Sequence, residues 1–142
     1  MFSITIEFLL KLIAQKNMIK KKILMVDDSE TNLLLFESMF EDEQRVEVIL
    51  KNNGKEIIEF CLLNKPDLIL LDLMMPEVSG FDVLELLQAN KSLEHIPIII
   101  LSALQGQADI KKAIEMGALD YIIKPINFEE NTKIILNALG LE

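Results

Sequence analysis

From residue 22 onwards, short apolar runs alternate with longer segments whose apolar residues recur at helical spacing. The apolar runs predict five β-strands, over residues 23–26, 46–50, 68–71, 98–101 and 121–123. Several runs contain only Ile, Leu and Val, which is typical of strands covered on both faces. The alternation predicts βαβ units and a five-stranded parallel sheet of the α/β class, arranged as a doubly wound three-layer α/β/α sandwich.

Local signals indicate where the intervening helices begin and end. Ser29 is expected to cap the first helix, Gly54 to open the second, and Gly80 to precede the third. Gly117 is placed to end the fourth helix, and the fifth carries the apolar residues Phe128, Ile134, Ile135 and Leu139. Because no linker or internal repeat separates these segments, a length of 142 residues predicts one main domain.

The N-terminal extension, residues 1–21, follows a different pattern. Polar residues Ser3, Glu7, Lys11 and Gln15 recur every four positions among apolar ones, which predicts an amphipathic helix. Charges interrupt the apolar stretch, and it is too short to cross a bilayer. It also lacks the basic start and the cleavage site of a signal peptide. Such a helix would pack on the domain, on a second copy or on a membrane surface.

An equally weighted alternative is that the protein starts at Met18. The segment Met-Ile-Lys-Lys-Lys-Ile-Leu leads from there directly into the first strand. The sequence therefore predicts an extension over residues 1–21, or chain upstream of the true start, and a domain over residues 22–142.

The net charge limits the classes of binding partner, and the cysteine content indicates the cellular location. The formal net charge is −9, and residues 1–22 hold five Lys and one Glu, which leaves −13 for the rest of the chain. So acidic a domain is a poor direct partner for nucleic acid and suits a cation or a basic protein surface. Cys61 is the single cysteine and cannot form an internal disulfide, so a cytoplasmic location is expected.

Polar side chains stand at the carboxyl ends of four predicted strands. Asp27 and Asp28 follow the first strand, Asp72 the third, Ser102 the fourth and Lys124 the fifth. In doubly wound sheets, ligands bind in the crevice outside these strand ends. We therefore expect the five side chains to share one site.

Three carboxylates in one crevice repel one another unless a cation compensates them. Mg²⁺ prefers oxygen ligands, whereas Cys61 and His95 lie away from the strand ends, which disfavours zinc and copper. Beside Mg²⁺, the carboxylate of Asp72 could attack a phosphoryl group, with Lys124 and Ser102 binding its oxygens. Taken singly, each residue also fits a helix cap, a turn or a solvated loop, but their joint placement favours the phosphoryl site.

Four segments match a known family in combination. They are Ile23-Leu-Met-Val-Asp-Asp-Ser, Pro66-Asp-Leu-Ile-Leu-Leu-Asp-Leu-Met-Met-Pro with Gly80, Pro97-Ile-Ile-Ile-Leu-Ser-Ala, and Gly117-Ala-Leu-Asp-Tyr-Ile-Ile-Lys-Pro. With these motifs, the chain resembles the receiver domain of two-component response regulators, in its single-domain form like the chemotaxis response regulator. The resemblance covers residues 22 to about 139 and implies a flavodoxin-like strand order of 2-1-3-4-5.

For the metal site, the resemblance implies Mg²⁺ or Mn²⁺ as cofactor. Carried over position by position, Asp72 is the phosphoacceptor, and Asp28 and the backbone carbonyl of Met74 bind the ion together with it. Asp27 contributes directly or through water.

For the phosphoryl group, the resemblance implies that Lys124 and Ser102 hold it and that Ser102 and Tyr121 act as the switch. The donor is then a phosphohistidine on a sensor histidine kinase or a histidine phosphotransfer domain. Phosphorylation biases the surface of the fourth helix, fifth strand and fifth helix of the domain. The chain ends at Glu142, so a partner in trans is expected to read that surface.

Enzymatic turnover of a separate substrate is not expected. A haloacid-dehalogenase-type phosphatase would require a second Asp at position 74, which is Met, and a flavodoxin-like electron carrier would require a phosphate loop after the first strand. The alternative that stays open is an interaction module that works without phosphorylation.

Overall fold

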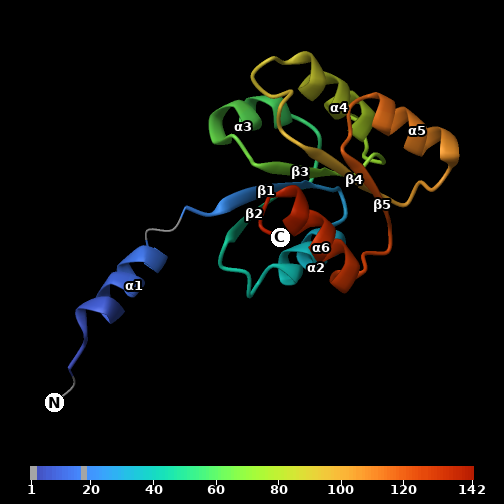
Figure 1. Cartoon of the computed structure of the whole chain (residues 1–142). Helices are drawn as coiled ribbons and strands as arrows, with labels where there is room; N and C mark the ends of the chain where they lie inside the picture. Colours follow the sequence, from blue (N-terminus) through green and yellow to red (C-terminus); the bar gives the residue numbers. More distant parts are fainter. Residues whose placement is uncertain (1–2, 17–18) are drawn as a thin grey trace.

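The computed structural model describes residues 3–16 and 19–142 and contains one parallel sheet. Its strands are β1 Lys21–Val26, β2 Val46–Lys51, β3 Leu68–Leu71, β4 Ile98–Ser102 and β5 Asp120–Ile123. The strand order is β2-β1-β3-β4-β5 (Figure 1). The predicted fold class and strand order are confirmed.

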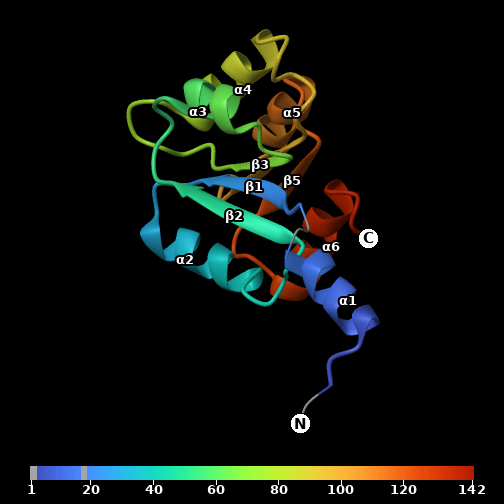
Figure 2. The same cartoon turned by 90° about the vertical axis from the view of Figure 1, so that its left-hand side faces the viewer.

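Helices cover both faces of the sheet. They are α2 Glu30–Met39, α3 Ile57–Asn64, α4 Gly80–Ala89, α5 Gln107–Glu115 and α6 Phe128–Ala138. Helices α2 and α6 lie on one face, and α3, α4 and α5 on the other (Figures 1 and 2). These three layers are the predicted sandwich. No helix in the described parts of the chain is long and apolar enough to cross a membrane.

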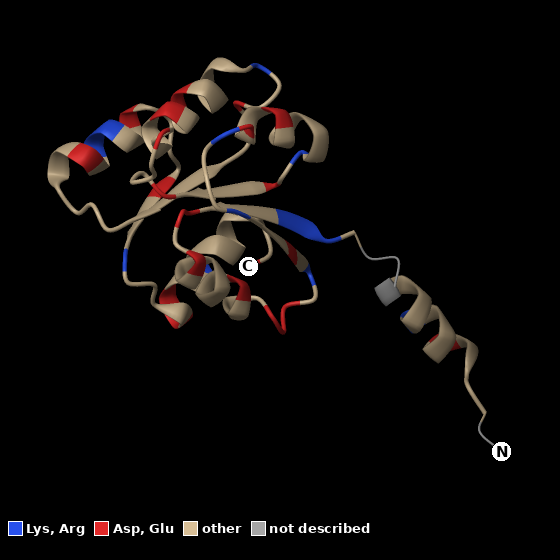
Figure 3. Cartoon of the chain, turned by 180° about the vertical axis from the view of Figure 1, so that it is seen from behind, with Lys and Arg blue, Asp and Glu red and all other residues tan. Residues whose placement is uncertain are grey.

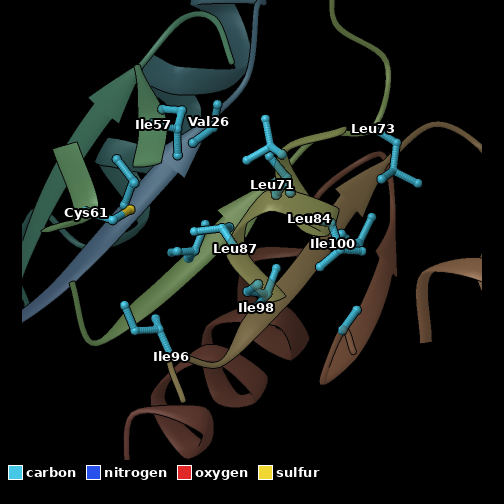
Figure 4. Packing of buried hydrophobic residues seen from close by; sticks show 14 of the residues in the cluster. Val26, Ile57, Cys61, Leu71, Leu73, Leu84, Leu87, Ile96, Ile98 and Ile100 are labelled. Carbon is cyan, nitrogen blue, oxygen red and sulfur yellow. The ribbon is translucent and has the colours of Figure 1, made fainter. Parts of the chain in front are cut away.

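The apolar part of β1, Ile23–Val26, is covered on both faces of the sheet. Ile23 and Met25 point into the core cluster beneath α2 and α6, while Leu24 and Val26 point into the cluster beneath α3, α4 and α5. All four side chains are fully buried. Figure 4 shows Val26 within the second of these clusters. A strand with two covered faces has no solvent side on which polar residues could alternate.

The ends of the strands differ slightly from the predicted ranges. Strand β1 begins at Lys21, because Lys21 pairs in register with Val46 on β2. Lys51, Ser102 and Asp120 likewise join the ends of β2, β4 and β5. The apolar runs therefore marked the strand centres, and pairing with neighbouring strands extends them into polar residues.

Two helix starts differ from the predictions. The helix expected to open at Gly54 begins at Ile57, because residues 54–56 form a turn in which Glu56 has a left-handed φ of 61°. Helix α4 begins at Gly80 itself, and Ser79 is its N-cap. The Ser79 hydroxyl accepts a hydrogen bond from the Asp82 amide at 3.2 Å, and the Asp82 carboxylate accepts one from the Ser79 amide at 3.1 Å.

Other helix ends were predicted correctly. Ser29 caps α2 by accepting the Asn32 amide at 3.3 Å. Gly117 follows α5 with a φ of 106°, a left-handed conformation that suits glycine.

The N-terminal extension contains helix α1, Ile6–Lys16, which stands apart from the sandwich (Figures 1 and 2). The Thr5 hydroxyl accepts the Phe8 amide at 3.1 Å, which explains the helix start, and Ser3 precedes the helix. Met18, the alternative start, lies outside the described residues. The division of the chain at residue 22 stays a prediction.

Candidate functional site

Three carboxylates meet at the carboxyl end of the sheet. Strands β1 and β3 pair so that Val26 lies opposite Leu71, and the residues that follow these two are therefore neighbours. One carboxylate oxygen each from Asp27, Asp28 and Asp72 lies within 4.8 Å of the others. Asp27 is fully buried, Asp72 is 4% exposed, and Asp28 is exposed. The predicted acidic cluster thus forms, with one member open to solvent.

Lys124 joins two of these carboxylates. It follows β5, and its Nζ lies 2.7 Å from Oδ2 of Asp27 and 3.2 Å from Oδ2 of Asp72. Burial alone would lower the pKa of Lys124, but the hydrogen bond to Asp27 and the negative charges of both carboxylates raise it instead. The ammonium group therefore stays charged at neutral pH and partly compensates the buried acids.

Each carboxylate oxygen of Asp72 accepts a hydrogen bond. The Met74 amide donates to Oδ1 at 3.2 Å, while Lys124 donates to Oδ2. Burial raises the pKa of Asp72, with Asp27 adding to the rise, although the Met74 amide and Lys124 oppose it. Holding this carboxylate ionised therefore destabilises the folded state, because the group is desolvated next to another acid.

Asp72→Asn is accordingly expected to raise the Tm by at least a few degrees in metal-free buffer at neutral pH. The gain should shrink as pH falls through the raised pKa of Asp72 and vanish below the ordinary value of 3.8, where the wild-type carboxyl is neutral in both states. Thermal unfolding followed by circular dichroism between neutral and acidic pH checks this. Asp42→Asn, an exposed Asp in a turn, is the matched control. A lower Tm for Asp72→Asn at neutral pH would contradict the argument.

Ser102 and Tyr121 are linked through the loop after β4. Ser102 is fully buried at the end of β4, and its hydroxyl accepts the Leu104 amide at 3.3 Å. The Tyr121 hydroxyl donates to the Leu104 carbonyl at 2.6 Å, which turns its ring inward. Burial raises the pKa of Tyr121, so this donor remains protonated. A movement of the Ser102 loop would therefore break or re-aim the Tyr121 hydrogen bond.

Gly80 has a role at the site that the sequence did not reveal. A Cβ at position 80 would lie 2.1 Å from the Asp72 carbonyl oxygen and 2.6 Å from the Leu73 Cα. The Gly80 amide also donates to the Leu73 carbonyl at 3.0 Å. The start of α4 thus packs directly on the backbone that carries Asp72. A glycine just inside a helix, where better helix formers are usual, was the available signal.

Asn32 is a second residue that the sequence reasoning missed. Its side-chain amide donates to Oδ2 of Asp27 at 3.4 Å, and the Ser29 amide donates to Oδ1 of Asp27 at 2.8 Å. With Lys124 also bound to Oδ2, Asp27 has partners on both oxygens. Asn32 lies in the first turn of the helix after the Asp pair, and that proximity could have suggested the contact.

The donor set fits a hard divalent cation. Its side-chain ligands are carboxylate oxygens, which Mg²⁺ and Mn²⁺ prefer. Cys61 is buried in the core and His95 precedes β4 at the opposite end of the sheet, so neither offers a softer ligand. The acidic cluster could therefore bind such an ion, with Asp28 as its most accessible member.

Known proteins are similar to this chain in fold and sequence. A response regulator receiver domain model matches residues 23–136. The polar-differentiation response regulator DivK of Brucella anthropi is 35% identical over 120 residues, which cover 84% of this chain and 97% of DivK. The signal receiver domain of a signal transduction histidine kinase from Syntrophus aciditrophicus is 31% identical with a TM-score of 0.75, covering 84% of this chain and 90% of that one. The Mn²⁺-bound form of response regulator Rcp1 is 26% identical with a TM-score of 0.73, covering 86% and 95%.

The family model spans most of the chain, and it includes every strand-end residue of the acidic cluster together with Ser102 and Lys124. The identity to DivK extends over nearly the whole of that relative. The chain therefore belongs to the response regulator receiver domain family of two-component systems.

Proposed function

We propose that this receiver domain takes a phosphoryl group onto Asp72 from a phosphohistidine of a sensor histidine kinase or a histidine phosphotransfer domain. The observation that carries the proposal is the ammonium group of Lys124 beside Asp72, at the open end of the sheet. An Asp72 oxygen attacks phosphorus in line, the P–O bond forms, and the P–N bond breaks with its electron pair passing to the imidazole. The product is an acyl phosphate on the chain itself, so no separate substrate is turned over.

Asp28, Asp72 and the Met74 carbonyl would hold Mg²⁺ or Mn²⁺. When bound, the ion neutralises charge on the carboxylates and on the transferring phosphoryl oxygens. Asp27 already accepts hydrogen bonds on both oxygens, which supports a role for it through water. The similar Rcp1 structure is of an Mn²⁺-bound form.

Lys124 and Ser102 hold the incoming phosphoryl group in this proposal. The ammonium group of Lys124 contacts Asp72 now and can bond a phosphoryl oxygen added there. The Ser102 hydroxyl accepts a hydrogen bond from the Leu104 amide, and as a hydroxyl it can also donate its own proton. Turning that proton towards the phosphoryl group would draw the loop after β4 inward.

Tyr121 transmits the state of the site to the surface of α5, β5 and α6, which are the domain's fourth helix, fifth strand and fifth helix. Its hydroxyl is bonded to the same loop. Apolar side chains are exposed on and beside these elements, namely Ile114, Leu119, Ile123 and Phe128. A downstream protein that binds this surface in trans would read the phosphorylation state.

Incubation with Mg²⁺ and acetyl phosphate, followed by intact mass measurement, tests the function. The wild type should gain the mass of one phosphoryl group, Asp72→Asn should gain none, and removal of Mg²⁺ by EDTA should suppress the gain at least tenfold. Asp42→Asn is the matched control and should behave as wild type. Equal gain by Asp72→Asn, or none by the wild type, would favour an interaction module that works without phosphorylation.

The acyl phosphate on Asp72 is expected to hydrolyse slowly. Met74 and Leu104 flank the site with apolar side chains where a polar group could orient an attacking water. Loss of phosphoryl mass after removal of the donor should therefore take minutes or longer, and Met74→Asn should shorten the half-life because its amide can bind water. Met74 is 56% exposed, so this change should leave the fold intact. A wild-type half-life of seconds would contradict the expectation.

A further inference from the structure

Helix α1 presents apolar side chains that nothing in the described chain covers. Phe8, Leu9, Leu12 and Ile13 are each about half exposed, and Ile6 is 77% exposed. Leu10, which is 59% exposed, extends the set, and at about 100° per residue these side chains occupy a continuous arc of about 200°, wider than half of the helix circumference. Exposed arcs of this width mark a binding surface for an apolar phase or partner.

A second copy of the chain is a poor occupant for this arc. Two identical helices meet along a narrow seam that repeats over at least three heptads, whereas α1 has only 11 residues. Pairing would therefore leave much of the arc in water. A parallel pair would also bring the lysines beyond the helix next to their copies.

Lysines cluster where α1 joins the sandwich. Lys16, Lys20, Lys21 and Lys22 fall within seven residues, and the side chains of Lys20 and Lys21 are exposed. Figure 3 shows the positive charge at the start of β1, on the side that faces α1. A basic cluster next to an amphipathic helix is the pattern that binds anionic lipid headgroups.

The acidic site around Asp72 repels an anionic lipid surface only weakly when that surface lies at the amino end of β1. The basic cluster lies at the amino end of β1, and the acidic site lies at its carboxyl end, about 20 Å away for a strand of six residues. Physiological salt screens charges beyond about 8 Å. Asp67, whose carboxylate accepts the Lys22 amide at 2.8 Å, and Glu47, opposite Lys22 on β2, are acids beside the cluster, so Lys20 and Lys21 supply its exposed positive charge, while the Asp72 site lies at the other end of β1.

We infer that α1 binds peripherally to an anionic lipid surface, with its apolar arc in the headgroup and acyl boundary and the lysine cluster at the headgroups. This tethers the receiver domain to a membrane while Asp72 stays open to a phosphoryl donor and the surface of α5, β5 and α6 stays open to a partner. The inference concerns a segment outside the Asp72 site, so it stands or falls independently of the phosphorylation proposal.

Flotation of the full chain with vesicles tests the inference. The wild type should float with vesicles of phosphatidylcholine mixed with phosphatidylglycerol, and bind them at least tenfold more strongly than vesicles of phosphatidylcholine alone. Leu9→Glu, in the centre of the arc, should weaken binding at least tenfold. Gln15→Glu adds the same charge at one of the polar positions that recur every four residues in the sequence, and it should have less than a threefold effect. Replacing Lys20 and Lys21 with Gln should remove most of the preference for the anionic vesicles.

Three results would overturn the inference. The first is a wild-type chain that fails to float with the anionic vesicles. The second is an equal loss for Leu9→Glu and Gln15→Glu, which would show that the arc is not the contact. The third is a dimer in vesicle-free solution that Leu9→Glu dissociates, which would assign the arc to a second copy. Uptake of phosphoryl mass from acetyl phosphate should be unchanged in every variant, which verifies folding separately.

Discussion

Replacing Gly80 with Ala is expected to lower the free energy of unfolding by about 2–3 kcal/mol, the upper part of the range of about 1–3 kcal/mol for forcing an extra methyl group into a packed region. The new Cβ would lie 2.1 Å from the Asp72 carbonyl oxygen. Helix propensity alone favours Ala over Gly by about 1 kcal/mol, so the expected sign is opposite to that of an unconstrained helix position. Because the clash falls on the backbone of Asp72, the variant should also take up phosphoryl groups more slowly.

Urea unfolding of the Gly80→Ala variant measures this effect. Gly106→Ala is a matched control, since Gly106 also stands at the start of a helix but its added Cβ would meet only the Asp109 carboxylate at 3.4 Å. The control should change the stability by less than about 1 kcal/mol. Equal effects of the two substitutions, or a more stable Gly80→Ala variant, would refute the role assigned to the close approach.

Asp28→Asn is expected to weaken Mg²⁺ binding at least tenfold, on the scale of losses seen when a group that supports a metal site is removed. Asp28 is the exposed member of the acidic cluster, so the change should remove a metal ligand without disturbing the core. Asp27 cannot readily replace it, because both of its oxygens already accept hydrogen bonds. The affinity should therefore fall while the fold is kept.

Isothermal titration with Mg²⁺ gives the affinity directly, and the Mg²⁺ concentration for half-maximal phosphoryl uptake gives it independently. Asp42→Asn carries the same loss of charge in an exposed turn and should bind Mg²⁺ as the wild type does. If Asp28→Asn retained wild-type affinity, the ion would have to bind elsewhere.

Much of the site could be predicted because parallel strands align their carboxyl ends. Val26 lies opposite Leu71, so an Asp after each strand had to lie close to the other whatever the side-chain details. In the pairing of β4 with β5, Ser102 lies opposite Ile123, so Lys124 follows one residue beyond this pair. The apolar runs mark the strand centres closely enough to place these residues at one edge of the sheet.

The remaining details depend on contacts between segments far apart in the sequence. The ion pairs of Lys124 with two carboxylates and the hydrogen bond of Tyr121 to the Leu104 carbonyl are side-chain choices that no local pattern specifies. The role of Gly80 arises only where α4 meets the end of β3. The left-handed conformation of Glu56 likewise places the start of α3 at Ile57, whereas the sequence indicated a start at Gly54.

Chemical trapping of the acyl phosphate identifies which carboxylate accepts the phosphoryl group. The wild-type chain would be incubated with Mg²⁺ and acetyl phosphate, reduced with borohydride, which converts a carboxyl phosphate to an alcohol, and digested for tandem mass spectrometry. If Asp72 is the phosphoacceptor, homoserine appears at position 72, and Asp27 and Asp28 stay unmodified. Homoserine at position 27 or 28, or at none of the three positions after phosphoryl mass has been gained, would contradict this assignment.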